Sequence, residues 1–191
     1  TLSLHDALPI SYKKVGNINI TNETIYKNFD WTNEDLRLLT LFRYWNIVEY
    51  FFPYKYQTDT NWDEVLNQLI SKFLHPKTEL DFHLAMLELI VSIDDSHAGL
   101  YTDVMTDFFG KYMMPAYFEV IEDKVVITHF FNESFAEKDD LRIGDVITKI
   151  DGQSLEDIFF NRSKYITGSN IPRKRHNSYH AIYKGSTDTV T

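Results

Sequence analysis

The stretch Ile93-Asp94-Asp95-Ser96-His97-Ala98 divides the sequence into two parts that differ in periodicity. Before it, apolar residues recur at helical spacing, and after it come runs that are typical of strands. Ser96 and His97 are adjacent, so they cannot by themselves supply the nucleophile and the base of a hydrolytic triad, because those partners meet from separate parts of a fold. Local chemistry leaves two interpretations open. The stretch either ends one element and carries an ordinary half-buried histidine, or it belongs to a reactive site.

Three helices are predicted before this stretch, between residues 31 and 91. Pro53 and the pair His75-Pro76 end the first two, because proline disfavours α geometry in the residue before it. Large apolar residues recur at helical spacing in all three helices, and each contributes about 1.5–3 kcal/mol when buried. These stripes are therefore interpreted as the core of a small bundle. The expected starts are threonines followed three residues later by aspartate, the capping-box pattern: Thr32/Asp35, Thr60/Asp63 and Thr78/Asp81.

Strand-like sequence follows the helical part. The β-rich runs Tyr117–Val120 and Val125–Phe131 flank the polar residues 122–124, a pattern that predicts a hairpin. A short helical turn is predicted over 134–139. Residues 141–152 read as a glycine turn, an alternating strand and a second, Asp-Gly turn.

The remaining sequence predicts two more helices and the start of a strand. Ser154 and Asp157 form a helix start of the same capping type. Pro172 is expected in the first turn of a further helix that ends near Gly185. Residues 188–191 are expected to begin a strand that the chain end cuts off.

The composition favours a protein with a packed core, and it argues against nucleic acid and anionic membranes as partners. Hydrophobic residues make up 43% of the 191 residues, which suits one or two domains. The formal net charge of −9 opposes a nucleic-acid or anionic-membrane surface, and the isolated basic cluster 173–176 is interpreted as a solvated face. No run approaches the roughly 20 apolar residues that span a bilayer. The absence of cysteine excludes a thiolate nucleophile and a Cys-ligated metal site.

The first residues are left out of the fold prediction. Residues 1–10 read TLSLHDALPI and resemble translated sequencing-adapter sequence. Residues 1–30 are together expected to form an irregular lead-in, since their apolar residues are scattered. No signal peptide is recognisable, and a true leader could have been lost, so the compartment stays open.

Motifs in both parts of the chain resemble one family. Gly144-Asp145-Val146-Ile147, Ile150-Asp151-Gly152 and the helix after them resemble the latter part of a protease-type PDZ domain. Four earlier motifs precede them in the family's order: Arg43-Tyr44-Trp45-Asn46, Tyr50-Phe51-Phe52-Pro53, Asn61-Trp62-Asp63 and Asp94-Asp95-Ser96-His97. The sequence thereby resembles the amino-terminal half of a tricorn-like serine peptidase, in the family that includes the carboxyl-terminal processing peptidases. The resemblance implies an α+β fold, with a helical domain over 31–110 and an incomplete PDZ-like domain over 111–191.

The resemblance also implies roles for two residues. In tricorn-like members the helical domain supplies a Ser-His pair, matched here by Ser96 and His97. The histidine serves there as general base and the serine supports the site, while the nucleophilic serine and an acidic partner lie in a later α/β domain. That later domain is missing from this sequence. Because the carboxyl-terminal processing branch uses a Ser-Lys pair instead, His97 favours the tricorn-like branch.

The same resemblance implies a protein or peptide substrate, no cofactor, and, loosely, a place in the cell envelope or periplasm. The PDZ-like domain would position the substrate, and its peptide-binding residues would be Met114, Ala116, Tyr117 and Phe118. The loop before this strand departs from the family. Many PDZ domains have a glycine-rich carboxylate-binding loop, whereas Pro115 here offers no backbone N–H donor.

Two other readings belong to different classes. A non-catalytic peptide-binding module would add an extended ligand to an exposed strand of the PDZ-like domain. A metal site could draw on Asp94, His97 and His129, but no His-x-x-x-His or Glu-x-x-His spacing supports it, so no metal is expected.

Overall fold

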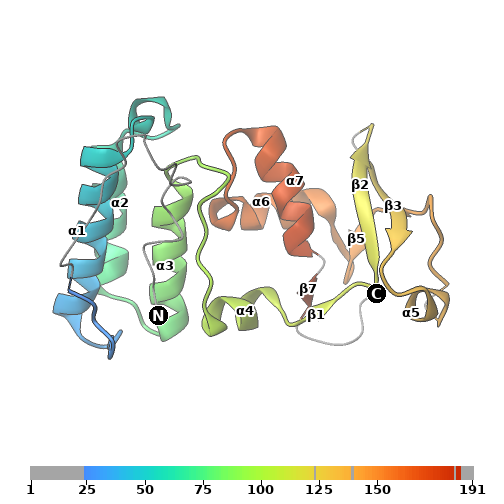
Figure 1. Ribbon diagram of the computed structural model, residues 1–191, viewed down its shortest axis with the longest axis horizontal. Helices are drawn as coiled ribbons and strands as arrows, with labels where there is room; N and C mark the ends of the chain where they lie inside the picture. Colours follow the sequence, from blue (N-terminus) through green and yellow to red (C-terminus); the bar gives the residue numbers. More distant parts are fainter. Residues whose placement is uncertain (1–23, 123, 139, 183, 186–191) are drawn as a thin grey trace, which may run out of the picture. The chain divides into compact units, whose positions relative to one another are not determined.

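The computed structural model describes residues 24–122, 124–138, 140–182 and 184–185 (Figure 1). The chain divides into two compact units, residues 1–102 and residues 103–191. Helices dominate the first unit, and short antiparallel sheets occur with helices in the second, so the α+β class is confirmed. The second unit begins at residue 103. The segments 1–10 and 188–191, about which the sequence made predictions, lie outside the described residues.

The first unit is built from the three predicted helices, α1 (Glu34–Phe51), α2 (Trp62–Leu74) and α3 (Glu79–Val91), with the short 3-10 helix η2 (Lys55–Gln57) between the first two. α1 packs against α2 and α2 against α3. The apolar stripes meet between the helices, as their spacing predicts. The buried residues are Leu41, Tyr44, Val48, Trp62, Val65, Leu69, Phe73, Phe82, Ala85, Met86, Leu87, Leu89, Ile90 and Val91.

Two of the three predicted helix starts are wrong by one residue. Asn33 caps α1 and Asn61 caps α2, each through a side-chain oxygen that accepts a backbone N–H of the first turn. Asparagine is at least as good an N-cap as threonine, and Thr32 instead donates its hydroxyl to Asp30 in the preceding turn. Thr78 forms the predicted capping box at α3.

Replacing Asn61 by alanine is expected to destabilise the first unit by about 1 kcal/mol, the usual cost of a lost N-cap. The matched change Thr60→Ala should leave stability within about 0.5 kcal/mol. Urea unfolding followed by tryptophan fluorescence measures both, since the three tryptophans all lie in this unit. Equal losses in the two variants would contradict the observed cap.

Arg37 is the buried cation of the first unit, with 6% of its surface exposed. Its guanidinium donates to the carbonyl oxygens of Phe73 (2.6 Å) and Leu74 (2.9 Å), at the end of α2. It also donates to the carbonyl oxygens of Trp31 (2.8 Å) and Thr32 (2.9 Å), just before α1. A positive charge at a helix C-terminus is favourable, and the last carbonyls of a helix have no partner within the helix. Arg37 therefore ties the start of α1 to the end of α2.

Two tryptophans join the same helices nearer the other end. The indole Nε1 of Trp45 in α1 donates to the carbonyl oxygen of Trp62 at 3.0 Å, and the Nε1 of Trp62 donates to the carbonyl oxygen of Trp45 at 3.0 Å. Buried indole N–H groups need an acceptor. The backbone carbonyl oxygen of each tryptophan accepts the indole N–H of the other. These two hydrogen bonds fix α1 against the first turn of α2.

The second unit begins with a helix that the sequence analysis missed, α4 (Asp103–Phe109). The predicted hairpin is confirmed: β2 (Ala116–Ile121) pairs antiparallel with β3 (Lys124–Phe130), and β4 (Val146–Ile147) pairs with the other edge of β3. The single alternating strand predicted within 141–152 is wrong. Two short strands occur instead: β4 pairs with β3, whereas β5 (Lys149–Ile150) pairs across the turn at 151–152 with β6 (Gln153–Ser154).

The remaining predicted helices of the second unit are present: α5 (Glu133–Lys138), α6 (Leu155–Arg162) and α7 (Ile171–Ile182). The short helix η3 (Ser163–Tyr165) follows α6. Ser154 caps α6 by accepting the backbone N–H of Asp157 at 3.1 Å, as predicted. Phe118, Val125 and Ile158 form a small core between the β2–β3 hairpin and α6.

A two-stranded ribbon closes the described part of this unit, with β1 (Tyr112–Met113) antiparallel to β7 (Lys184–Gly185). Gly110, just before β1, has φ +101° and lies so close to Gly185 that a Cβ there would stand 2.3 Å from its backbone. Glycine tolerates both the positive φ and the close approach of another backbone, because it has no Cβ. Along the described ranges, no helix combines the length and the apolar character needed to cross a membrane.

Candidate functional site

The segment after α3 is shaped by a left-handed residue and two apolar anchors. Ser92 caps the end of α3, and its hydroxyl donates to the carbonyl oxygen of Glu88 at 2.8 Å. Asp94 then adopts φ +51°, a conformation that aspartate tolerates better than most residues. Ile93 and Ala98 are buried on either side of the polar residues. The chain therefore reverses here while both ends of the turn stay fixed to the core.

Asp94 ties this loop to the segment before α2. Its Oδ2 accepts the backbone N–H of Asp59 at 2.8 Å. The contact joins residues that are far apart in sequence, so the loop is held by more than its own turn.

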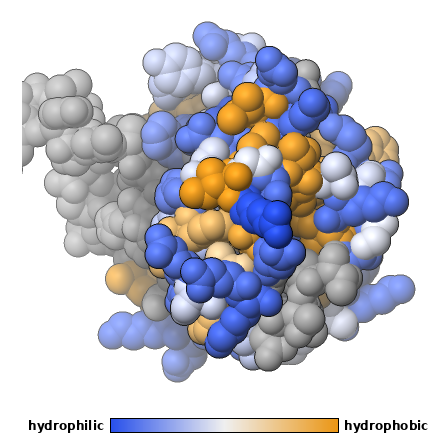
Figure 2. Space-filling view, turned by 90° about the vertical axis from the view of Figure 1, so that its right-hand side faces the viewer, coloured by the Kyte–Doolittle hydropathy of each residue, from blue (hydrophilic) through white to orange (hydrophobic). Residues whose placement is uncertain are grey.

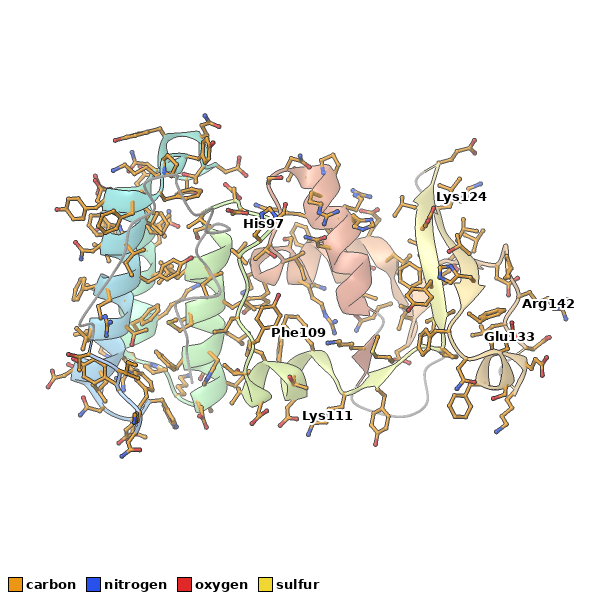
Figure 3. All side chains as sticks on the ribbon, viewed as in Figure 1. His97, Phe109, Lys111, Lys124, Glu133 and Arg142 are labelled. Carbon is orange, nitrogen blue, oxygen red and sulfur yellow. The ribbon has the colours of Figure 1, made fainter. Side chains whose placement is uncertain are left out.

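Asp95 and His97 form the polar centre of the loop, and Figure 3 labels His97 where it follows α3. Oδ1 of Asp95 lies 2.8 Å from the backbone nitrogen of His97 and 3.0 Å from its ring Nδ1. The histidine side chain is 92% exposed, and the aspartate side chain 35%. One carboxylate oxygen therefore holds both the backbone and the ring of a histidine that is open to solvent.

Tyr44 of α1 is buried in the first unit, within the electrostatic reach of Asp95. Burial raises the pKa of the Tyr44 phenol well above its ordinary value, and the negative charge of Asp95 raises it further. The phenol therefore stays protonated at neutral pH. Asp95 therefore interacts with the buried, uncharged phenol of Tyr44 and with the exposed imidazole of His97.

Ser96 is half-buried and lies between the two members of the pair. It does not end the helix, because Ser92 takes that place.

An exposed aromatic ring lies beside the loop. Tyr101 is 86% exposed, yet its ring approaches Gly99 so closely that a Cβ at Gly99 would lie 2.9 Å from it. The Tyr101 ring can lie this close to the backbone because Gly99 has no side chain. An aromatic surface thereby lies three residues after Ala98, the end of the stretch that contains His97.

The four candidate peptide-binding residues lie in the second unit, on β2 or just before it. Ala116 and Phe118 are buried, and Met114 packs against the small core. Tyr117 is 45% exposed and points to the other face, where its ring stacks on His129 with centroids 4.2 Å apart. Side chains alternate along a strand, so Tyr117 is the one residue of the four with a largely exposed side chain.

The second unit exposes several large apolar residues around this strand. Phe131 meets the Tyr117 ring edge-on, with centroids 5.4 Å apart. Figure 2 shows hydrophobic surface surrounded by hydrophilic residues on the side of the molecule that carries β3 and α5. The large exposed apolar residues of β2, α5, β4 and the segments that adjoin them are Tyr117, Ile121, Phe131, Phe135, Ile143 and Val146.

β2 is an edge strand in the described residues, because β3 pairs along one side of it and no described strand pairs along the other. An open edge presents backbone N–H and C=O groups to which another extended segment can pair. Among the same residues, no group of three or more His, Asp or Glu side chains is placed to hold a metal ion.

No family model matches this sequence, and no curated protein matches it. The site is therefore characterised by its own geometry. Ser96 and His97, the residues the sequence analysis selected, lie in one loop. Asp95 is the residue that the analysis left without a role, although its spacing from His97 was a usable signal, since aspartate often hydrogen-bonds the backbone two residues on.

Proposed function

We propose that this sequence is part of a serine peptidase resembling the tricorn-like enzymes, with His97 as the general base. The observation that carries the proposal is the Asp95–His97 pair. Nδ1 of His97 is 3.0 Å from a carboxylate oxygen while the side chain is 92% exposed. A base needs its ring oriented and its other nitrogen accessible, and this pair supplies both conditions.

The chemistry follows from the nature of the nucleophile. A serine hydroxyl is weak until a base removes its proton, and a neutral imidazole can do so near pH 7. Nε2 of His97 would take that proton as the serine oxygen bonds to the substrate carbonyl carbon, and would return it to the leaving amine. Water would then release the acyl group by the same route. The resemblance assigns the nucleophilic serine to a later domain of the full-length protein.

A PDZ-like role for the second unit belongs to the same proposal. The β2–β3 hairpin, the Asp151-Gly152 turn and α6 follow one another in the order that the resemblance implies. In this role the unit would hold an extended stretch of substrate against the open edge of β2.

A peptide-binding module without catalysis is the second candidate. The observation that favours it is that same open edge of β2, with the exposed ring of Tyr117 beside it. Backbone pairing would give affinity, and Tyr117 would select the side chains of the ligand.

A fluorophosphonate probe separates the two candidates in the full-length protein. An activated serine attacks the phosphorus of the probe and displaces fluoride, which leaves a stable label. We expect wild type and the control His75→Ala to be labelled at one serine, and His97→Ala to be labelled at least about 100-fold more slowly, since a general base contributes roughly 10²–10⁴ in rate. His75 is an exposed histidine just after α2.

Two results would count against the proposal in different ways. Equal labelling of His97→Ala and wild type would mean that another group, such as a lysine, activates the serine. No labelling of the wild type, together with peptide-induced shifts of the β2 amide signals, would favour the binding module.

A further inference from the structure

We infer that Asp95 is the positioning residue of His97: its carboxylate holds the proton on Nδ1 and leaves the lone pair on Nε2 for the incoming proton. This inference rests on the proposed function for its catalytic meaning. The resemblance places the acidic partner in a later domain, whereas the geometry points to an acid within the same loop, two residues before the base.

The contact selects one tautomer because a carboxylate accepts and does not donate. An ionised aspartate offers only lone pairs, so a ring nitrogen 3.0 Å from Oδ1 carries its hydrogen when the imidazole is neutral. Which ring nitrogen is protonated is set by the hydrogen bond that the other makes. Nε2 of the neutral ring is therefore the basic nitrogen, as a general base requires.

The loop fixes this contact in space. The same Oδ1 accepts the backbone N–H of His97 at 2.8 Å, and the backbone N–H of Ala98 donates to the carbonyl oxygen of Asp95 at 3.3 Å. Because Ala98 is buried, the turn that carries the pair is anchored to the core of the first unit. Asp95 thus cannot swing away without breaking the backbone contact as well.

Asp94 provides the comparison. It is the adjacent residue and has the same side chain, but its Oδ2 is engaged with the backbone N–H of Asp59 at 2.8 Å. Removing the charge at position 94 therefore tests for a general effect of lost negative charge near His97. Removing it at position 95 tests the specific contact.

Long-range ¹H–¹⁵N NMR of the histidine ring in the 191-residue chain tests the inference without any need for activity. At a pH where His97 is neutral, we expect the Nδ1–H tautomer to be the major one in wild type and in Asp94→Asn. In Asp95→Ala the ratio of Nδ1–H to Nε2–H should fall at least about threefold, a modest factor because exposed charged contacts are screened.

The variant Asp95→Asn keeps an oxygen for the backbone N–H and removes the charge, so it should give an intermediate ratio with the turn intact. The amide signal of Asp59, which contacts Asp94, reports whether the loop keeps its fold in the two Asp95 variants. A wild type with mainly Nε2–H, or an unchanged ratio in Asp95→Ala with the Asp59 signal in place, would overturn the inference.

The two claims fail separately. If the tautomer follows Asp95 but the full-length protein takes no fluorophosphonate label, the positioning contact stands and the peptidase proposal falls. If labelling depends on His97 but the tautomer ignores Asp95, the peptidase proposal stands and the acidic partner lies elsewhere.

Discussion

Replacing Arg37 by methionine is expected to destabilise the first unit by about 3–5 kcal/mol, because four backbone carbonyl oxygens lose a charged donor at once. Methionine fills a similar volume but donates nothing. It would leave the carbonyl oxygens of Trp31, Thr32, Phe73 and Leu74 without their donor, and each buried acceptor that loses its hydrogen bond costs about 1–3 kcal/mol. Water can reach some of these groups, so the four costs should not add in full.

Urea unfolding monitored by tryptophan fluorescence measures this loss in the first unit, which contains all three tryptophans. Arg43→Met is the matched control on the same helix. Its guanidinium contacts the carbonyl oxygen of Thr24 at 3.3 Å in an exposed setting, so we expect a loss below about 1 kcal/mol. Similar midpoints for Arg37→Met and wild type would show that the four carbonyl contacts do not stabilise the unit.

Arg37 also shows where sequence reasoning stops. The residue lies at the start of a helix, and its partners Phe73 and Leu74 are 36 and 37 positions away. Nothing in local periodicity or capping chemistry indicates that a cation will be buried there. The same holds for the paired contacts of Trp45 and Trp62, which depend on how α1 and α2 pack.

The predicted helix caps were correct where no second capping residue was adjacent in the sequence. Thr78 caps α3 as predicted, whereas Thr32 and Thr60 have an asparagine beside them that takes the cap. The seven-residue helix α4 is too short to show a period. The predicted strand within 141–152 divides because its first part, β4, pairs with β3, while its second part, β5, pairs with β6 across the turn at Asp151 and Gly152.

The sequence indicated where the candidate site lies, but it did not indicate every residue of the site. The stretch 93–98 identified His97, and the structure places Asp95 against its ring. That β3 alone among the described strands pairs with β2 could not be foreseen, since strand order depends on which of several short strands pair. The side-chain alternation that buries Phe118 and exposes Tyr117 follows from the strand itself.

Replacing His97 by alanine is expected to lower kcat of the full-length protein by about 10²–10⁴, the usual contribution of a positioned general base. This corresponds to roughly 3–5.5 kcal/mol of transition-state stabilisation at 1.36 kcal/mol per tenfold. KM should change little, because a loss confined to the transition state lowers kcat and kcat/KM together. Folding should also be unaffected, since the side chain is 92% exposed and adds little to the core.

The pH dependence of this variant gives a second signature. The base must be neutral to accept the serine proton, so kcat/KM of the wild type should rise with pH as His97 loses its proton. That ascending limb should disappear in His97→Ala and remain in His75→Ala. Circular dichroism of the variants tests whether the fold is retained.

The central claim, that His97 is the base of a serine peptidase, is tested most directly by peptide hydrolysis in the full-length protein. The measurement is kcat/KM against pH for wild type, His97→Ala and His75→Ala. We predict a fall of at least about 100-fold with loss of the ascending limb in His97→Ala alone. A folded His97→Ala protein that hydrolyses the peptide at the wild-type rate, with the limb unchanged, would contradict it.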